Sequence, residues 1–112
     1  LPLGYFGAST GAAAALAAAA RLGDEVSVVV SRGGRPDLAL ASLSGVVAPT
    51  LFIVGGADTT VLELNREAQA KLICPSELLV IPGATHLFAE PGALEAVADA
   101  AAAWCSDHLP SG

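Results

Sequence analysis

The fold is decided by the stretch Gly4-Tyr5-Phe6-Gly7-Ala8-Ser9-Thr10-Gly11, in which a short apolar run leads directly into the pattern Gly-x-Ser-x-Gly. Residues 12–20 follow at once and are almost all alanine, the strongest helix former. A sharp turn between a strand and a helix lifts a serine hydroxyl out of the sheet, so we expect Ser9 to be a nucleophile on such an elbow. Gly7 and Gly11, which have no Cβ, would let strand and helix approach closely. The alternative is an ordinary strand-to-helix turn with a capping Ser or Thr.

The length of the chain fits a single domain. Its 112 residues and 11.0 kDa suffice for a hydrophobic core. They fall short of the roughly 200 residues of a complete doubly wound enzyme. The chain contains no methionine, and the strand before Ser9 starts within its first few residues. We therefore expect residues 1–112 to form one partial domain, either the C-terminal part of a longer one or a reduced version of it.

Charge and cysteine content narrow the classes of partner. Five Lys and Arg against eleven Asp and Glu give a net charge of −6, which opposes binding to nucleic acid and to anionic lipid. The longest wholly apolar run, residues 12–20, is far shorter than the roughly 20 residues that cross a bilayer. No secretory leader precedes the first strand, so we expect a cytoplasmic protein. Cys74 and Cys105 have no metal-like spacing, and we expect two free thiols, no metal and no cofactor.

Strand and helix patterns alternate four times along the chain. After the strand that leads to Ser9, the predicted strands are residues 26–30, 50–54 and 77–81. The predicted helices are residues 11–22, 37–44, 61–72 and 91–108. This alternation predicts an α/β fold with about four parallel strands flanked by helices.

Two of the predicted helices carry an apolar stripe at helical spacing. On the helix near residue 61 the stripe consists of Val61, Leu64, Ala68 and Leu72. On the last helix, which Pro91 opens as first residue, it consists of Leu94, Val97, Ala101, Trp104 and His108. We expect these stripes to face the sheet, and we expect no functional role for His108.

A polar loop, Ser31-Arg32-Gly33-Gly34-Arg35-Pro36-Asp37, follows the second predicted strand. Open α/β sheets bind ligands at the carboxyl ends of their strands. Arg32 and Arg35 are therefore candidate substrate-binding residues, and solvated loop charges are the alternative.

Three residues with complementary chemistry follow three predicted strands. Ser9, Asp58 and His86 each come directly after a strand, and the carboxyl ends of parallel strands share one edge of a sheet. Acyl transfer needs a nucleophile, a base that takes its proton and an anion that orients the base. The order Ser, Asp, His along the chain is that of the α/β-hydrolases. Taken singly, Asp58 could be a helix N-terminal acid and His86 a structural hydrogen-bonding residue.

The sequence also resembles a known family in four motifs. These are Gly7-Ala8-Ser9-Thr10-Gly11, residues 31–37, Leu51-Phe52-Ile53-Val54-Gly55-Gly56-Ala57-Asp58 and Pro82-Gly83-Ala84-Thr85-His86-Leu87-Phe88. They are similar to the dienelactone-hydrolase-like branch of the α/β-hydrolase superfamily, and more narrowly to the domain fused behind a phosphoribosyltransferase domain in some bacteria. The resemblance covers essentially the whole chain but only the C-terminal half of the family's domain.

This resemblance implies roles for individual residues. Ser9 corresponds to the nucleophile, Asp58 to the acid, His86 to the base and the backbone N–H of Thr10 to one oxyanion-hole donor. The second donor of the family comes from a loop after an earlier strand that this sequence lacks, and one donor is worth about 10²–10³ in rate. Dienelactone hydrolases proper carry Cys as nucleophile, so Ser9 favours a general ester over dienelactone.

Two functions follow from these patterns. The first is a serine hydrolase that cleaves small carboxylic esters through an acyl-enzyme. The second is a catalytically weak or silent module that serves in binding or assembly of a phosphoribosyltransferase-type protein.

The sequence further predicts a homodimer. In the resembled fold the strand that leads to Ser9 has neighbours on both sides, so here Leu3, Tyr5 and Phe6 would lie on an open apolar edge. We also expect exposed helix surface around Trp104. The last helix should pack on the sheet face opposite the helix that ends near Leu72, which separates the two cysteines.

Overall fold

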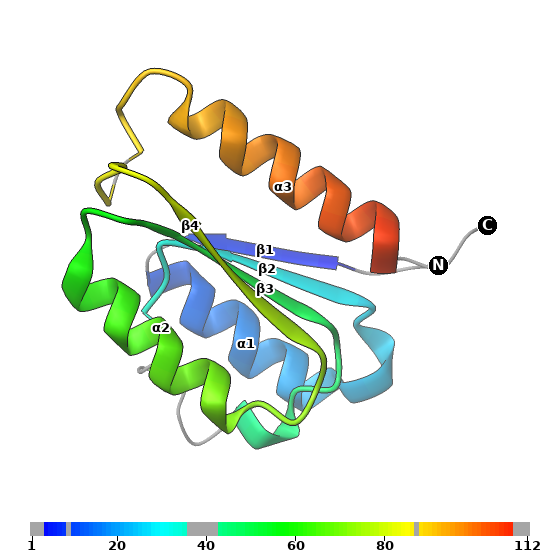
Figure 1. Cartoon of the computed structure of the whole chain (residues 1–112). Coiled ribbons are helices and arrows are strands. Elements are labelled where there is room, and N and C mark those ends of the chain that lie inside the picture. Colours follow the sequence, from blue (N-terminus) through cyan, green and yellow to red (C-terminus); the bar gives the residue numbers. More distant parts are fainter. Residues whose placement is uncertain (1–3, 9, 36–42, 87, 109–112) are drawn as a thin grey trace.

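The computed structural model describes residues 4–8, 10–35, 43–86 and 88–108. These residues form a parallel sheet in the order β1-β2-β3-β4, flanked by helices (Figure 1). The strands are β1 (Gly4–Ala8), β2 (Val28–Arg32), β3 (Thr50–Gly55) and β4 (Ser76–Ile81). The helices are α1 (Thr10–Leu22), the short η1 (Gly23–Glu25), α2 (Thr59–Lys71) and α3 (Ala93–His108). The predicted α/β fold with four parallel strands is confirmed.

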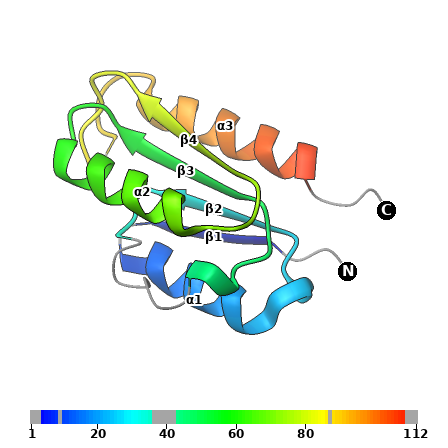
Figure 2. The ribbon, with the colours of Figure 1, turned by 60° about the horizontal axis from the view of Figure 1, so that its bottom comes forward.

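The sheet separates two layers of helices. Helices α1 and α2 cover one face and α3 covers the other (Figures 1 and 2). On the first face Leu16 of α1 and Ala68 of α2 pack in one cluster with Val29 and Phe52. On the second face Val97 and Trp104 of α3 pack in another cluster with Val28, Val30, Leu51 and Ile53. Successive strand residues point to opposite faces, so β2 and β3 are buried on both sides and consist largely of Val, Leu and Ile.

The turn from β1 into α1 requires one of the two expected glycines. A Cβ atom at Gly7 would lie 2.6 Å from both Ala12 Cα and Gly11 O, closer than any side chain tolerates. At Gly11 a Cβ would meet no described atom within 4 Å, so the expectation of crowding there is wrong. The close contact of β1 with the backbone of α1 therefore depends on Gly7.

The bounds of most elements differ from the sequence-based expectation by one or two residues, and for β2 and α3 the structure shows the reason. Strand β2 is residues 28–32 rather than 26–30, because Ser31 and Arg32 pair with Phe52 and Ile53 of β3, and Gly33, with φ 54°, then ends the strand. Helix α3 starts at Ala93 rather than Pro91, since Gly92 has φ 80°, which is incompatible with a helix. Residues 37–42 of the predicted helix 37–44 lie outside the described residues, and residues 43–45 form a 3₁₀ turn.

The stripe on α3 is confirmed only in part. Val97 and Trp104 are buried, but Leu94 is 53% exposed, so its predicted place in the core is wrong. The expectation of exposed surface around Trp104 is also wrong for this side chain, which is only 8% exposed and whose Nε1 donates to the carbonyl of Pro49 at 3.3 Å. His108 stacks on the Trp104 ring, with 3.9 Å between ring centroids.

The two cysteines lie in different layers. Cys74 packs against the α1/α2 cluster, whereas Cys105 packs against the α3 cluster, and both are free thiols, as predicted. Burial raises the pKa of the Cys74 thiol, and a hydrogen bond with Thr50 lowers it by less. Within the described residues no helix is long and apolar enough to cross a membrane.

Candidate active site

Asp58 follows β3 at the carboxyl edge of the sheet. A tight turn, closed by a hydrogen bond from Asp58 N to Gly55 O at 3.0 Å, brings the chain from β3 to the start of α2. Asp58 occupies the N-cap position of α2, but its side chain makes no capping hydrogen bond. Instead its Oδ2 lies 2.9 Å from Nδ1 of His86. The contact with His86, rather than helix capping, accounts for the carboxylate at this position.

His86 lies in the loop that follows β4. Gly83, with φ 72°, allows the turn after the strand, and Ala84 N donates back to Ile81 O at 3.2 Å. The His86 side chain is 39% exposed and the Asp58 side chain 17% exposed, so the pair is screened from solvent on the Asp58 side. A carboxylate accepts hydrogen bonds but does not donate them, so the proton belongs on Nδ1 and the lone pair of the neutral ring on Nε2.

Main-chain hydrogen bonds join the two loops that carry this pair. Gly56 N donates to Ile81 O at 2.8 Å, and Ala57 N donates to Ala84 O at 3.0 Å. A Cβ atom at Gly55 would overlap the carbonyl oxygen of Ala84, so only glycine permits this approach. Figure 2 shows the carboxyl ends of β3 and β4 at the same edge of the sheet. The separation of Asp58 and His86 is thus set by the backbone.

A second clamp holds the far side of the His86 loop. One carboxylate oxygen of Glu90 accepts from Thr85 N and the other from Thr85 Oγ1, both at 2.9 Å. These bonds favour the charged form, first the one from the backbone N–H, and they hold the pKa of Glu90 below its usual range. Phe88 N donates to Thr85 O at 3.0 Å, and Phe88 itself has φ 55° and is buried. An uncommon backbone angle at a buried aromatic residue marks a constrained loop.

The end of β2 lies directly beneath the imidazole. A Cβ atom placed on Gly33 would be 3.4 Å from His86 Nδ1 and 3.4 Å from Phe88 Cε2, so Gly33 faces both rings across a space that a methyl group would just fill. Arg32, the last residue of β2, places its guanidinium 5.6 Å from the centroid of the Phe88 ring. This cation–π contact holds the Arg32 side chain beside the His86 loop. Arg35 lies three residues further along and is half-buried.

The other residues named from the sequence lie partly outside the described residues. Ser9 and Asp37 are outside them, so neither enters this geometry. Thr10 is the first residue of α1, and its backbone N–H is therefore one of those at the helix N-terminus that have no partner within the helix. The structure thus brings Asp58, His86 and Arg32 to one edge of the sheet.

Sequence analysis missed one polar residue that borders this region, Asn65. It lies on the inner face of α2 next to Leu64 and Ala68, and it is fully buried. Its Nδ2 donates to Gly34 O at 3.1 Å and to Val61 O at 2.7 Å. The available signal was an amide within the apolar stripe of a helix, a place where a buried polar group needs a partner.

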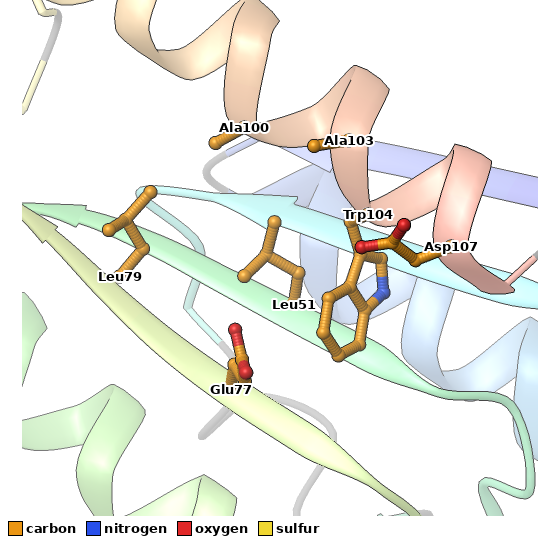
Figure 3. Close-up of a pocket in the computed structure, with 7 residues that line it drawn as sticks. All are labelled: Leu51, Glu77, Leu79, Ala100, Ala103, Trp104 and Asp107. Carbon is orange, nitrogen blue, oxygen red and sulfur yellow. The ribbon is translucent and has the colours of Figure 1, made fainter.

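A separate hollow of about 200 Å³ lies on the α3 face of the sheet (Figure 3). It is lined by Leu51, Glu77, Leu79, Ala100, Ala103, Trp104 and Asp107. It contains none of the residues around His86 and is smaller than the roughly 300–1,000 Å³ of pockets for drug-sized ligands. Among the described residues no group of three or more His, Cys, Asp and Glu is placed to hold a metal ion.

Comparisons with known proteins bear on the family and the fold of the chain. Residues 2–108 match the family described as "Dienelactone hydrolase family". A crystal structure of dienelactone hydrolase from Anabaena variabilis superposes with a TM-score of 0.96 at 55% identity, covering 98% of this chain and 51% of that one. In two strains of Mycobacterium tuberculosis, proteins named "Putative phosphoribosyl transferase" are 64% identical over the whole of this chain, which covers 26% of each.

The chain therefore spans about half the length of the solved relative and about a quarter of the length of the mycobacterial ones. The match to the family extends over nearly all of its residues and includes the loops that carry Asp58 and His86. The chain belongs to the dienelactone hydrolase family of α/β hydrolases.

Proposed function

We propose that the chain is a serine hydrolase that cleaves small carboxylic esters through an acyl-enzyme, with Ser9 as nucleophile, His86 as base and Asp58 as the orienting acid. The observation that carries this proposal is the 2.9 Å hydrogen bond between His86 Nδ1 and Asp58 Oδ2 at the carboxyl edge of the sheet. An acid and a base joined in this way are two of the three groups that acyl transfer needs.

In the proposed reaction the proton follows a closed path. Nε2 of neutral His86 takes the proton of the Ser9 hydroxyl as its oxygen attacks the ester carbonyl, and the Asp58 carboxylate stabilises the imidazolium. The imidazolium then protonates the leaving alcohol, which leaves an ester of Ser9. Water, deprotonated by Nε2, attacks this acyl-enzyme, and the proton returns to Ser9 as the carboxylic acid departs.

The oxyanion of the tetrahedral intermediate needs donors that are already oriented. In this proposal the backbone N–H of Thr10 is one of them, because it belongs to the free N–H groups at the start of α1. The positive end of the α1 dipole adds to its effect.

Arg32 and Arg35 are the proposed substrate-binding residues. The guanidinium of Arg32 stacks on Phe88 next to the Gly33 backbone that faces His86, so a negative group on the substrate could reach it. We expect Arg32→Gln to raise KM for an ester that carries a carboxylate and to leave KM for p-nitrophenyl acetate within about twofold. Equal changes for both esters would remove Arg32 from substrate binding.

Labelling of Ser9 tests the nucleophile directly. A fluorophosphonate should add once to the folded chain, as read by intact mass, and Ser9→Ala should abolish both the adduct and ester hydrolysis. An adduct that persists in Ser9→Ala would refute the assignment.

The base is tested with the other histidine as a matched control. His86→Ala should remove the turnover of p-nitrophenyl acetate, whereas His108→Ala, which removes a ring stacked on Trp104, should retain it. Equal turnover in the two variants would contradict the proposed role of His86.

A second candidate function is a catalytically silent binding or assembly module of a phosphoribosyltransferase-type protein. It is favoured by the relatives named "Putative phosphoribosyl transferase", of which the matched region is only 26%. The two candidates are distinguished by the labelling experiment, because a silent module would neither form the Ser9 adduct nor lose activity in His86→Ala.

We further propose that the chain forms a homodimer through β1. This strand is at one end of the described sheet order, and Phe6 on it is 57% exposed. Beside it lies an apolar hollow of about 150 Å³ lined by Gly4, Tyr5, Phe6, Val28, Val30 and Cys105. Open strand edges with apolar side chains pair with further strands. A two-fold dimer would pair the two β1 strands antiparallel.

Sedimentation at micromolar concentration tests the dimer. We expect twice the mass of 11.0 kDa for the unmodified chain, and monomers for Phe6→Glu. Leu94→Glu is the control, because Leu94 is as exposed as Phe6 but belongs to α3. A monodisperse 11.0 kDa species for the unmodified chain would show the proposal wrong.

A further inference from the structure

Asn65 is buried at a position where packing alone would favour an apolar side chain. It is among the few polar side chains with no exposed surface in the described part of the chain, together with Ser31 and Thr50. Its neighbours on the inner face of α2 include Ala68, which belongs to the hydrophobic cluster beneath the sheet. Leucine has a similar volume and would fill this space without a polar group to satisfy.

The hydrogen bonds of Asn65 are one-sided. Nδ2 donates to the carbonyl oxygens of Gly34 and Val61, whereas buried Oδ1 has no partner among the described residues. An unpaired buried acceptor is unfavourable, so the amide is not an efficient way to stabilise the core. Its effect is specific, because it ties α2 to a loop 31 residues away in the sequence.

The loop that Asn65 holds is the glycine turn after β2. Gly33 N donates to Ile53 O of β3 at 2.7 Å, and Gly34 O accepts from Asn65, so the turn is anchored at both residues. A Cβ atom at Gly34 would overlap Ala12 Cβ and Ser31 Oγ. The turn therefore packs against Ala12 of α1 and is hydrogen-bonded to Asn65 of α2.

The imidazole of His86 faces this anchored turn. Gly33 has φ 54°, and a Cβ atom there would lie 3.4 Å from His86 Nδ1 and 3.5 Å from His86 Cε1. The same point is 3.4 Å from Phe88 Cε2. Gly33 thus borders the space in which the imidazole lies, and a displaced turn would change the size of that space.

We propose that Asn65 is a positioning residue for His86: by holding the carbonyl of Gly34, it fixes the glycine surface that keeps the imidazole in line with Asp58. Helix α2 then has two tasks, because Asp58 stands at its N-terminus and Asn65 lies two turns further along. Helix α2 thus carries both the proposed acid, Asp58, and the residue that holds the turn next to the proposed base. This inference rests on the proposed role of His86 as the base.

Two substitutions separate the bond to Gly34 from the rest of the side chain. In Asn65→Thr the hydroxyl can still donate to Val61 O within the helix but is too short to reach Gly34 O. Asn65→Leu removes both bonds at nearly constant volume. We expect kcat for p-nitrophenyl acetate to fall about 10- to 100-fold in each, with KM within about threefold, because small misplacements of a catalytic group are costly.

The control is Gln69→Leu. Gln69 is also an amide on α2, four residues further along, and its Nε2 donates to Ser76 Oγ at 3.2 Å, at the start of β4 and away from His86. We expect the thermal stability of Gln69→Leu to fall about as much as that of the Asn65 variants. Its kcat should stay within about twofold of that of the unmodified chain. Equal losses of kcat in the Asn65 and Gln69 variants would mean that the effect is general destabilisation, and the inference would fall.

A spectroscopic measurement makes the test independent of activity. At mildly alkaline pH the ¹⁵N chemical shifts of the His86 ring report which nitrogen carries the proton. We expect the Nδ1–H form to dominate in the unmodified chain and in Gln69→Leu, and to give way to a mixture of both forms in Asn65→Thr. If no ester is hydrolysed but this change is seen, the proposed function fails while the positioning role stands.

A further measurement does not depend on how the variants fold. In the unmodified chain the side-chain amide protons of Asn65 should exchange slowly with solvent, because both are engaged in buried bonds. Rapid exchange would overturn the inference, as would unchanged kcat and unchanged ring shifts in the folded Asn65→Thr variant.

Discussion

Asp58→Asn is the substitution that most directly tests the acid–base pair. It exchanges one carboxylate oxygen for an amide group of the same shape. Asparagine and aspartate are equally good at the N-cap position, and the Asp58 side chain makes no capping bond that could be lost. We therefore expect the thermal unfolding midpoint to change by no more than about 2 °C, so that any loss of activity belongs to the site.

The expected loss of rate in Asp58→Asn can be estimated from the distance between Asp58 and His86 and from their exposure to solvent. In the transition state the charge centres of the carboxylate and the imidazolium lie roughly 4 Å apart, which gives about 4 kcal/mol at an effective dielectric constant near 20 and about 1 kcal/mol in bulk water. With 17% of Asp58 and 39% of His86 exposed, solvent reduces the interaction only in part. An attraction of about 4 kcal/mol corresponds to about 10³ in rate, the lower end of the range of about 10³–10⁴ for loss of the orienting acid.

The assay is steady-state hydrolysis of p-nitrophenyl acetate, with kcat and KM determined separately. We expect kcat to fall about 10³-fold and KM to change little, because the carboxylate acts on the base rather than on bound ester. Asp99→Asn, which neutralises an exposed carboxylate on α3, is the control and should retain full activity. If folded Asp58→Asn keeps kcat within about fivefold, Asp58 is not the acid, and Asp37, outside the described residues, becomes the next candidate.

Three further predictions concern the loops and the thiols. Gly55→Ala places a Cβ against the carbonyl of Ala84, so we expect a loss of about 1–3 kcal/mol in urea denaturation, and an unchanged midpoint would contradict the contact. The pKa of Glu90 is held below its usual range by Thr85, so its carboxylate stabilises the fold at neutral pH and ceases to do so as pH falls through that lowered pKa. Glu90→Gln should therefore unfold at a lower temperature than the unmodified chain at pH 7, and this difference should vanish as pH falls through the lowered pKa of Glu90. Because burial raises the pKa of Cys74, its reaction with iodoacetamide at neutral pH should be slower in the folded than in the unfolded chain, and equal rates would argue against its burial.

The fold could be predicted because hydrophobic periodicity and alternation of element types carry it. Residues 51–54, for example, are apolar throughout, which is typical of a strand buried on both faces. The ends of elements were less predictable. Ser31 and Arg32 are polar yet belong to β2, because strand pairing with β3 continues until the backbone of Gly33 turns away. Leu94 is apolar yet exposed, because Gly92 sets where α3 begins and therefore which residues face the sheet.

Asp58 and His86 could be predicted as neighbours because parallel strands end at a common edge. The roles assigned to them, and to Ser9, Thr10, Arg32 and Arg35, stay proposals. The contacts around Asp58 and His86, in contrast, could not be predicted from any pattern in the sequence. Asn65 meets Gly34 only because two segments 31 residues apart pack together, and Gly33 meets His86 only after β2 is aligned with β3. Such contacts depend on the assembled structure and not on any local pattern.

Apart from the bond between Asp58 and His86 themselves, the hydrogen bonds that join their two loops are made by main-chain atoms. Nearly every amino acid supplies these atoms, so the exposed side chain of Ala57 could be randomised in a mutant library without moving the pair, whereas Thr85 also donates to Glu90 through its hydroxyl. Gly55 is the exception, since any larger residue there separates the loops. Under the proposed function, the rim of the site could therefore vary widely while the Asp58–His86 pair keeps its geometry. The backbone contacts would then hold Asp58 and His86 in place while the side chains around them change in evolution.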